Sequence, residues 1–339
     1  MNIRSKIDKY SQDNNFSGDI SIYRKHNSIY HNSFGYRDIS NKIPNNGNTI
    51  FGTASGTKTF TALGIIKLIE LGLIEFSTTI YDIFQSDLGF ISSEATIKQL
   101  LTHTSGIFDY YDEELITDFD NFTVEIPWFR LETPSDYLPL FESKKMKFNP
   151  GNRPSYSNGG YVFLGIIIEK LSGLSYREFM NKNVFEPLNM KFTGFYAFNA
   201  LPKNVASGYI STEEKLMTNI YQLPIRGAGD GGMYTNSSDM QVFWTKLFRN
   251  ELISETHLKE FISNEVEIFN SQKYGLGIYI SLFEKYECYF ANGCDSGVGY
   301  TSLYIPEIEL NINVFSNMTE GDKKIMDFIR ENGSDLLSL

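Results

Sequence analysis

Ser55 and Lys58 are the first residues in the chain whose types and spacing could support chemistry. They lie three positions apart in the segment 51–60, which reads Phe-Gly-Thr-Ala-Ser-Gly-Thr-Lys-Thr-Phe. Apolar residues recur after them at helical spacing, so we expect Ser55 at a helix start and Lys58 one turn later on the same face. A serine hydroxyl is a weak nucleophile until its proton is taken, and a desolvated lysine can take it or hold a tyrosinate that does. The pair predicts a nucleophilic serine, and the helix N-terminus favours developing negative charge there.

The spacing of Ser55 and Lys58 carries little weight alone. A Ser-x-x-Lys pattern is expected by chance about once in a chain of this length at average composition. Serine is also a preferred helix N-cap, so Ser55 could have that structural role only. Thr212 and Lys215 have a similar spacing, and nothing around them in the sequence indicates chemistry.

A second group of polar residues, Tyr156 and Asn158, supports the chemical interpretation. They lie in the segment 150–161, Pro-Gly-Asn-Arg-Pro-Ser-Tyr-Ser-Asn-Gly-Gly-Tyr, directly before an apolar helical run that ends at Ser172 and Gly173. A tyrosine hydroxyl near a lysine can relay a proton, and an asparagine amide can bind both a lysine and a substrate carbonyl. The structural alternative is that the tyrosine packs in the core and the asparagine caps the helix.

Ser-x-x-Lys at 55–58 followed by Tyr-x-Asn at 156–158 resembles the pattern of class C β-lactamases, D-alanyl-D-alanine carboxypeptidases and related esterases, relatives of the penicillin-binding proteins. Further segments agree with that family in the same order, and the resemblance runs from about residue 18 to the end of the chain. They are Leu-Leu-Thr-His-Thr-Ser-Gly at 100–106, Pro-Gly at 150–151, Gly-Asp-Gly-Gly-Met-Tyr-Thr-Asn-Ser-Ser-Asp at 229–239 and Tyr-Gly-Leu-Gly at 274–277. This ordered agreement is far more specific than either short motif.

The resemblance implies a role for each of these residues. Ser55 would attack the substrate carbonyl, while Lys58 and Tyr156 would manage its proton. Asn158 would hold the lysine and the acyl amide of the substrate, and water would then release the acyl group. His103 invites comparison with the base of a Ser-His pair. Its segment is structural in the family, however, so we expect no direct catalytic role for it.

The third family motif, Lys-Thr-Gly or His-x-Gly on a strand, has its best counterpart in Ala291, Asn292 and Gly293. The basic residue is missing, and shifting the alignment by one places Asn292 in the basic position, which leaves the same absence. Because that cation helps orient a substrate carboxylate in the family, its absence argues against strong β-lactam or D-Ala-D-Ala recognition. Asn292 and Gly293 remain candidate substrate-binding residues, and the backbone N–H groups of Ser55 and Cys294 form the candidate oxyanion hole.

Elements near both ends of the chain must position these residues. Strand-like segments follow an N-terminal helix and precede a C-terminal one. The terminal helices are expected at 2–13 and around 325–329, and the strands at 19–23, 28–36, 286–290, 300–305 and 310–315. The middle of the chain is mainly helical. Its helices are expected at 58–72, 96–103, 158–172 and 175–185, the last with Ser175 as N-cap and with its end before Pro187.

We therefore predict an α/β (α+β) fold. With the resemblance, it is a β-lactamase/transpeptidase-like fold, in which terminal helices flank a mainly antiparallel sheet and a mainly helical lobe is inserted. The chain 1–339 is expected to be one catalytic domain, with an α/β lobe at about 1–95 and 265–339 and a helical lobe at about 96–264. The site is expected in the cleft where Ser55 begins its helix.

Composition argues against several other functions. A net charge of -11 over 339 residues, without clusters of lysine and arginine, argues against a nucleic-acid partner. The scattered histidines and the pair Cys288 and Cys294 fit no metal, redox or disulfide pattern, so no metal or cofactor is expected. Gly-x-Gly-x-x-Gly at 227–232 lacks the strand and helix of a dinucleotide site, and we expect a glycine-rich turn. No membrane span is expected, and the chain as written indicates the cytoplasm, or an extracytoplasmic location if a leader was removed.

The leading hypothesis is a serine hydrolase that forms an acyl-enzyme on Ser55 and cleaves an amide or ester of a small molecule or short peptide. Short D-amino-acid peptides and small esters rank above β-lactams, with weak β-lactam hydrolysis left open. The alternative is a slowly turning over penicillin-binding or sensor protein, or a catalytically silent binding protein on the same fold. The intact Ser55, Lys58, Tyr156 and Asn158 favour an active enzyme, whereas Ala291 keeps slow turnover open.

Overall fold

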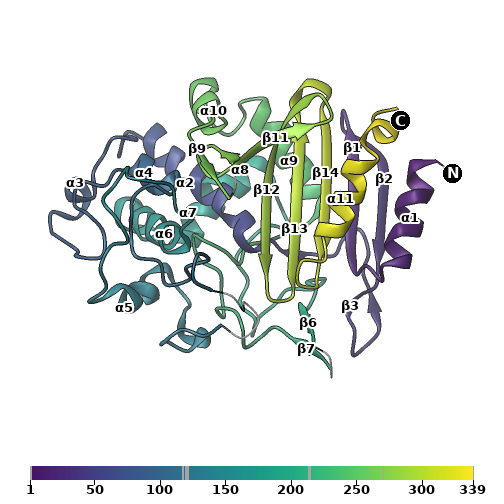
Figure 1. Cartoon of the computed structure of the whole chain (residues 1–339), viewed down its shortest axis with the longest axis horizontal. Coiled ribbons are helices and arrows are strands. Elements are labelled where there is room, and N and C mark those ends of the chain that lie inside the picture. Colours follow the sequence, from purple (N-terminus) through teal and green to yellow (C-terminus); the bar gives the residue numbers. More distant parts are fainter. Residues whose placement is uncertain (1, 117, 119–121, 213–214, 270, 339) are drawn as a thin grey trace.

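The computed structural model describes residues 2–116, 118, 122–212, 215–269 and 271–338, and Figure 1 shows their arrangement. Its main element is an antiparallel sheet with the strand order β2-β1-β14-β13-β12-β11-β10-β9. The strands are β1 (Gly18–Arg24), β2 (Asn27–Phe34), β9 (Val266–Ile268), β10 (Gln272–Tyr274), β11 (Tyr279–Phe283), β12 (Tyr286–Asp295), β13 (Val298–Ile305) and β14 (Leu310–Ser316). The predicted fold class is confirmed.

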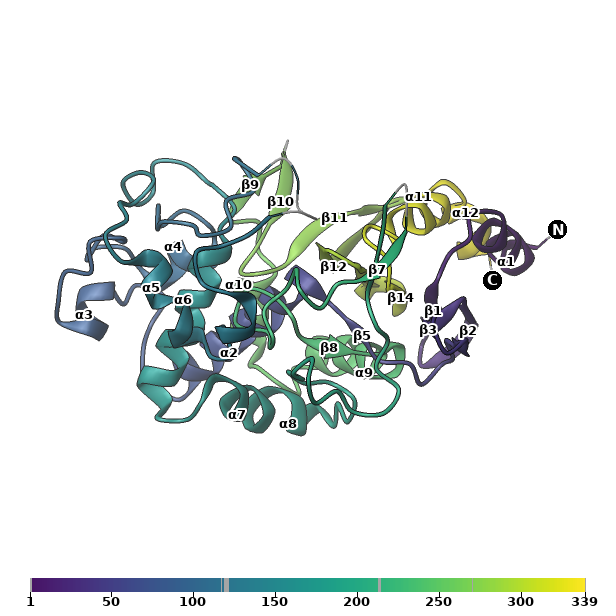
Figure 2. The same ribbon diagram turned by 90° about the horizontal axis from the view of Figure 1, so that it is seen from below.

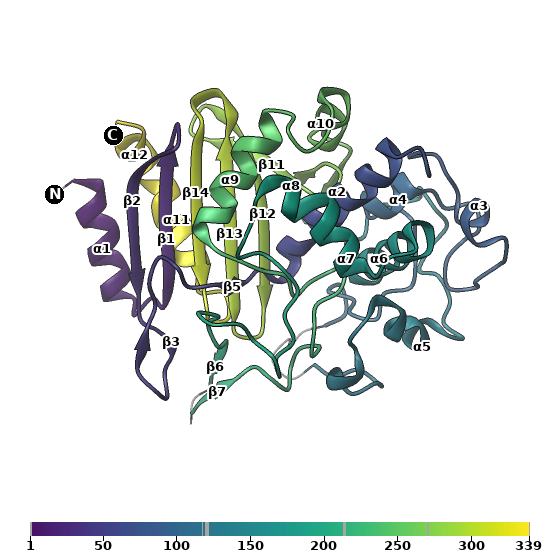
Figure 3. The same cartoon turned by 180° about the vertical axis from the view of Figure 1, so that it is seen from behind.

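The two ends of the chain meet in this sheet. β1 pairs with β14 from Gly18 opposite Ser316 to Arg24 opposite Leu310. Helices cover both faces, with α9 on one side and the terminal helices on the other (Figures 1 and 3). These helices are α1 (Ile3–Asp13), α9 (Ser237–Phe248), α11 (Lys323–Glu331) and α12 (Gly333–Leu337). Because both faces are covered, β13 and β14 are buried at every residue instead of alternating between buried and exposed.

A row of polar side chains crosses the buried centre of this sheet. Ser21, Asn313 and Ser302 lie opposite one another on β1, β14 and β13. Asn313 Nδ2 donates to Ser21 Oγ at 3.1 Å, and Ser302 Oγ donates to Asn313 Oδ1 at 2.5 Å. Trp244 of α9 completes the row, since its Nε1 donates to Ser302 Oγ at 2.7 Å. A slip of one residue in strand register would separate these partners, so the row fixes both the register and the position of α9.

The helices that carry the candidate site lie beside the sheet, as Figure 2 shows from below. The two longest are α2 (Thr57–Glu70) and α6 (Asn158–Ser172), which pack against each other. α6 begins after Ser157, whose hydroxyl accepts from Gly160 N–H, and ends at Gly173 with a left-handed φ of +69°. Both helices are buried over most of their length, so apolar residues occur all round them and not only on one face.

Short elements connect these larger ones. The helices are α3 (Ile80–Phe84), α4 (Ile97–Leu101), α5 (Leu138–Phe141), α7 (Tyr176–Met180), α8 (Glu186–Leu188) and α10 (Glu255–Phe261), with a π-helical turn η4 (Asn181–Phe185). The 3-10 turns are η1 (Ala54–Gly56), η2 (Trp128–Arg130), η3 (Pro134–Tyr137) and η5 (Pro306–Ile308). Three small antiparallel pairs are β3 (Tyr36–Asp38) with β4 (Ile43–Pro44), β5 (Phe51–Gly52) with β8 (Tyr234–Thr235), and β6 (Tyr209–Ser211) with β7 (Leu216–Thr218).

Most of the predicted elements are present, with ends shifted by a few residues. The helix predicted at 158–172 has those bounds as α6. The helix predicted at 175–185 is present with Ser175 as its N-cap, but it contains a π-helical turn after Met180, and its predicted end before Pro187 is wrong because α8 runs on to Leu188. The strand predicted at 286–290 runs on to Asp295, since pairing with β13 holds its small and polar residues in the sheet. The lobe boundaries stay a prediction.

Replacing Asn313 by alanine tests the polar row. The change leaves the buried Ser302 hydroxyl without its acceptor and Ser21 without its donor from β14, so we expect the free energy of unfolding to fall by about 3 kcal/mol. Urea unfolding measures the shift as a lower midpoint with an unchanged slope. Asn48→Ala, in an exposed turn, is the matched control and should stay near wild type. Equal midpoints for the two variants would contradict the role of the row.

Candidate active site

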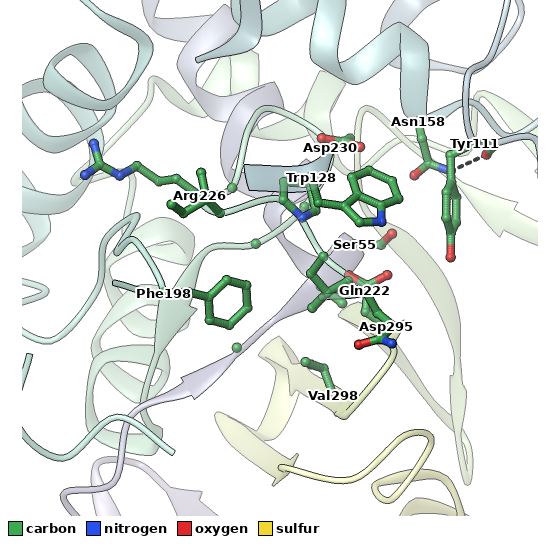
Figure 4. Close-up of a pocket in the computed structure, with 18 of the residues that line it drawn as sticks. Ser55, Tyr111, Trp128, Asn158, Phe198, Gln222, Arg226, Asp230, Asp295 and Val298 are labelled. Atoms are coloured by element: carbon green, nitrogen blue, oxygen red, sulfur yellow. Dashed lines mark hydrogen bonds between the residues drawn. The ribbon is translucent and has the colours of Figure 1, made fainter. Parts of the chain in front are cut away.

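Ser55 lies at a sharp turn between β5 and α2. The preceding residue, Ala54, has a φ of +46°, a left-handed conformation that is uncommon for a residue with a side chain. Thr57 supports the turn from behind, because its hydroxyl donates to Ala54 O at 2.7 Å and accepts from Met233 N–H at 3.0 Å. The N-cap position of α2 is Gly56, so Ser55 is not used as the helix cap. Figure 4 shows Ser55 at the surface of a pocket.

Lys58 lies one turn into α2 and is almost completely buried, with 1% of its surface exposed. Its Nζ donates to Ser55 Oγ at 3.0 Å, to Asn158 Oδ1 at 2.7 Å and to the backbone oxygen of Asp230 at 2.7 Å. Burial lowers the pKa of this amine, and the carboxylates of Asp230, Glu113 and others nearby oppose that effect. A neutral amine is therefore easier to form here than in water, and it lies within reach of the Ser55 proton.

Tyr156 lines one cavity together with Ser55, and the nearby Ser55 hydroxyl acts to lower the pKa of its phenol. Its ring lies 4.8 Å from Lys58 Nζ. Burial raises the pKa of the phenol well above its usual range, and nearby groups, including Tyr279 and Glu113, raise it further. The resting phenol is thus neutral, which suits a group that relays a proton and not one that stores negative charge.

Asn158 is the first residue of α6, and its side chain points towards Lys58 instead of capping the helix. Its amide oxygen accepts from Lys58, while its Nδ2 donates to Tyr111 O at 2.9 Å and to Glu113 Oε1 at 3.1 Å (Figure 4). The cap of α6 is Ser157, and the carboxylate of Asp109 accepts from the first two backbone N–H groups of the helix. The Nδ2 group that the resemblance assigns to the substrate is therefore already engaged.

β12 passes directly beside the nucleophile at Gly293. A Cβ atom added there would lie 2.1 Å from Thr53 O and 2.7 Å from the backbone nitrogens of Ser55 and Gly56. Only glycine fits this approach, which brings β12 against the backbone of η1. Asn292 lines the same cavity as Ser55, but its Nδ2 donates to Tyr300 O and to the Thr301 hydroxyl on β13.

Cys294 follows Gly293 and lies at the rim of the same cavity. The residue as a whole is exposed, yet partial desolvation of its thiol and the negative charge of Asp295 raise its pKa to about 12. The reactive thiolate is therefore scarce at neutral pH. Cys288 is buried, and both cysteines are free thiols.

His103 lies behind the site among aromatic rings. Its ring contacts Tyr156, Tyr161 and Tyr274, with centroids 4.5 to 5.1 Å apart. Its Nδ1 accepts from Ser157 N–H at 3.0 Å, and burial together with the charge of Lys58 lowers its pKa well below the usual range. Within the described residues no hydrogen bond joins His103 to Ser55. The neutral ring supports the turn before α6.

Sequence reasoning missed three carboxylates around Lys58: those of Asp230, Asp295 and Glu113. Burial raises the pKa of all three, that of Asp295 to about 7, while Lys58 opposes the rise. Asp230 Oδ2 accepts from Tyr110 OH at 2.6 Å. Asp230 belongs to the glycine-rich segment 227–232, which is a turn, as predicted, and its backbone oxygen binds Lys58. For these three carboxylates, the sequence offered one indication, which is that Asp295 lies two residues after Gly293.

Ser55 borders two cavities. The first, with about 760 Å³ of space that is partly open to solvent, lies over the glycine-rich turn and is shown in Figure 4. Its walls include Trp128, Phe198, Asp230, Asp295 and Arg226. The second, of about 720 Å³, lies between Tyr156 and β12. Its walls include Phe269, Gln272, Tyr279, Phe290 and Asn292. Ser55 therefore has room for a substrate group on each side.

In the part of the chain that the structure describes, no group of His, Cys, Asp or Glu side chains could hold a metal ion. None of the described helices is long and apolar enough to cross a membrane.

Comparison with known proteins decides the family. The family model described as Beta-lactamase matches residues 3–331. The chain belongs to the beta-lactamase family. A penicillin-binding protein of Bacillus subtilis (strain 168) is 29% identical over 292 residues, which cover 81% of this chain and 62% of that protein. The chain thus spans less than two thirds of the length of that relative.

Solved structures agree with this assignment. The crystal structure of a penicillin-binding protein from Bacillus halodurans has a TM-score of 0.90 and 35% identity, covering 96% of this chain and 99% of the other. A D-amino acid amidase from Ochrobactrum anthropi SV3, complexed with L-phenylalanine, has a TM-score of 0.83 with 20% identity and covers 98% of each chain. The amidase likeness concerns the fold alone. The predicted membership of the β-lactamase and penicillin-binding protein family is confirmed.

Replacing Gly293 by alanine tests the contact between β12 and the nucleophile. The added methyl group would push β12 away from the Ser55 backbone and disturb the candidate oxyanion hole, so we expect ester hydrolysis to fall by about 10²-fold or more. Steady-state hydrolysis of p-nitrophenyl acetate measures the change. Gly165→Ala within α6 is the matched control, because its Cβ would approach only the Pro134 ring at 3.2 Å and Gly229 N at 3.6 Å. Full activity in Gly293→Ala would contradict this placement of the oxyanion hole.

Proposed function

We propose that the protein is a serine hydrolase that cleaves an amide or ester through an acyl-enzyme on Ser55. The observation that carries the proposal is the distance of 3.0 Å between the buried Lys58 Nζ and Ser55 Oγ. Such a nucleophile and base in hydrogen-bond contact, with the base held by Asn158 and Asp230, is the arrangement that activates a serine. Membership of the beta-lactamase family supports the same chemistry.

The reaction follows from these contacts. Ser55 Oγ adds to the substrate carbonyl carbon while its proton passes to Lys58 Nζ. The backbone N–H groups of Ser55 and Cys294 would stabilise the oxyanion. The bond to the leaving group then breaks as the proton passes from Lys58, through the Tyr156 hydroxyl, to the leaving nitrogen or oxygen. A water molecule next adds to the acyl carbon, and release of the carboxylic acid restores the Ser55 hydroxyl.

Charge around Ser55 indicates which substrates fit. Ala291 supplies no cation on β12, and Asp230, Asp295 and Glu113 surround the site with carboxylates. A substrate carboxylate would meet repulsion there, whereas a neutral or amino-bearing substrate would not. We therefore rank short D-amino-acid peptides, amides and small esters above β-lactams. The fold likeness to a D-amino acid amidase is compatible with this ranking.

Slow turnover of a penicillin-type acyl-enzyme is the second candidate. Asn158 Nδ2 already donates to Tyr111 and Glu113, so a substrate amide could bind it only by displacing one of these partners. With β-lactams, a long-lived adduct on Ser55 would favour this candidate, and rapid release of product would favour the hydrolase.

Kinetics of two single variants test the proposed function. We expect Ser55→Ala to reduce the hydrolysis of p-nitrophenyl acetate to background, and Lys58→Met to reduce kcat/KM by about 10³-fold, because the general base is lost. Lys215→Met is the matched control, since Lys215 has the same spacing from Thr212 but lies exposed beside β7. Circular dichroism checks that each variant is folded. Wild-type rates in folded Ser55→Ala would exclude the proposed nucleophile.

A further inference from the structure

We propose that the apolar groove beside the active-site pocket binds the apolar tail of the substrate, so that the preferred substrates are esters or amides with an extended alkyl or aryl group. This inference rests on the proposed function and names its substrate class. The groove is lined by residues of the segments 123–129 and 220–225 and by Phe198, and its space, including the part open to solvent, is about 1060 Å³.

The groove and the active-site pocket share walls. Trp128, Phe198, Leu223 and Ile225 line both of them. In Figure 4, Phe198 lies on the side of the pocket away from Asn158, with Trp128 between the two. A substrate chain that leaves Ser55 in this direction would therefore pass from the polar end of the pocket onto a continuous apolar surface.

Backbone hydrogen bonds hold the shared walls together. Ile225 N–H donates to Trp128 O at 3.0 Å, and Phe198 N–H donates to Ile225 O at 2.9 Å. Three segments that are distant in sequence are thus joined at the junction. These hydrogen bonds hold the junction in one arrangement, which lowers the cost of ordering a bound chain.

The outer part of the groove exposes large apolar side chains to water. Phe129 is 67% exposed, Ile220 46% and Tyr221 81%. Exposed apolar patches of this kind mark binding surfaces in folded proteins. The polar features near the groove do not oppose an uncharged tail, because the Arg226 guanidinium turns away from the pocket and lies 3.4 Å from Glu132 (Figure 4).

A series of neutral esters measures the effect of tail length. The substrates are p-nitrophenyl acetate, butyrate, hexanoate and octanoate, which vary the acyl tail, and the matching alkyl acetates, which vary the leaving group. In at least one series we expect kcat/KM to rise about threefold per added methylene group, because each methylene leaves water for the groove. All concentrations stay below those at which the esters form micelles.

A double variant confined to the outer groove isolates its contribution. We expect Phe129→Glu with Ile220→Glu to flatten the dependence on tail length while leaving acetate hydrolysis at the wild-type rate. The matched control is Leu71→Glu with Leu282→Glu, which adds the same charge at apolar residues that are 58% and 62% exposed elsewhere. A flat dependence in the wild type, or an equal slope in the groove variant, would overturn the proposal.

A binding measurement separates failure of the groove from failure of the proposed function. The chain has two tryptophans, Trp128 at the junction and the fully buried Trp244. In Ser55→Ala, decanol should change the tryptophan fluorescence in a saturable way, and the groove variant should lose this change. If the fluorescence shows no saturable change, this result counts against the groove, even if ester hydrolysis depends on Ser55. A saturable change without Ser55-dependent hydrolysis would retain the groove and reject the enzyme.

Sedimentation equilibrium tests the other possible occupant, a second copy of this chain. We expect a monomer, or an oligomer that persists in the double variant Phe129→Glu with Ile220→Glu. A dimer that this double variant dissociates, together with a flat dependence on tail length, would show that the groove is an interface between copies.

Discussion

Burial of the Lys58 amine is the constraint on which the rest of the site depends. Removing an ammonium group from water costs several kcal/mol, and the cost is acceptable only where its donors are satisfied or its proton is lost. Here its three hydrogen bonds go to Ser55 Oγ, Asn158 Oδ1 and Asp230 O. These acceptors belong to three separate parts of the chain, the turn before α2, the start of α6 and the glycine-rich segment. These hydrogen bonds offset the cost of burial. The burial also lowers the pKa of the amine, which makes Lys58 a usable base.

The large sheet matters to this site because it holds β12 beside the nucleophile. Gly293 lies so close to the Ser55 and Gly56 nitrogens that no side chain fits between them. The place of β12 is set by pairing with β13, which pairs in turn with β14 and, through it, with β1. Without β1, the strand β14 would lose its partner on one side and become an edge of the sheet. The site therefore depends on residues from almost the whole length of the fold, although its reacting groups lie on a few short segments.

The sequence indicated the residues whose roles are local. Ser55 and Lys58 lie within one helical turn, and Tyr156 and Asn158 lie within one entry turn, so spacing and family resemblance located them, while their catalytic roles stay proposals. It did not reveal the carboxylates of Asp230, Asp295 and Glu113, because their importance arises only when distant segments surround one buried amine. It also offered a helix cap as the alternative role of Asn158, where the structure uses Ser157 instead. The sequence also did not predict that β12 extends to Asp295. This extension depends on pairing with β13, and the residues involved have low strand propensity.

The mass of the intact protein tests most directly whether Ser55, activated by Lys58, takes part in covalent acyl transfer. Wild type and Ser55→Ala are each mixed briefly with an activated ester and, separately, with a β-lactam, quenched in acid, and then digested to locate any adduct. We expect an added acyl mass in wild type alone, on the peptide that contains Ser55 and Lys58. An adduct on another residue, such as Cys294, or steady turnover without any adduct on Ser55 under rapid quenching, would contradict it.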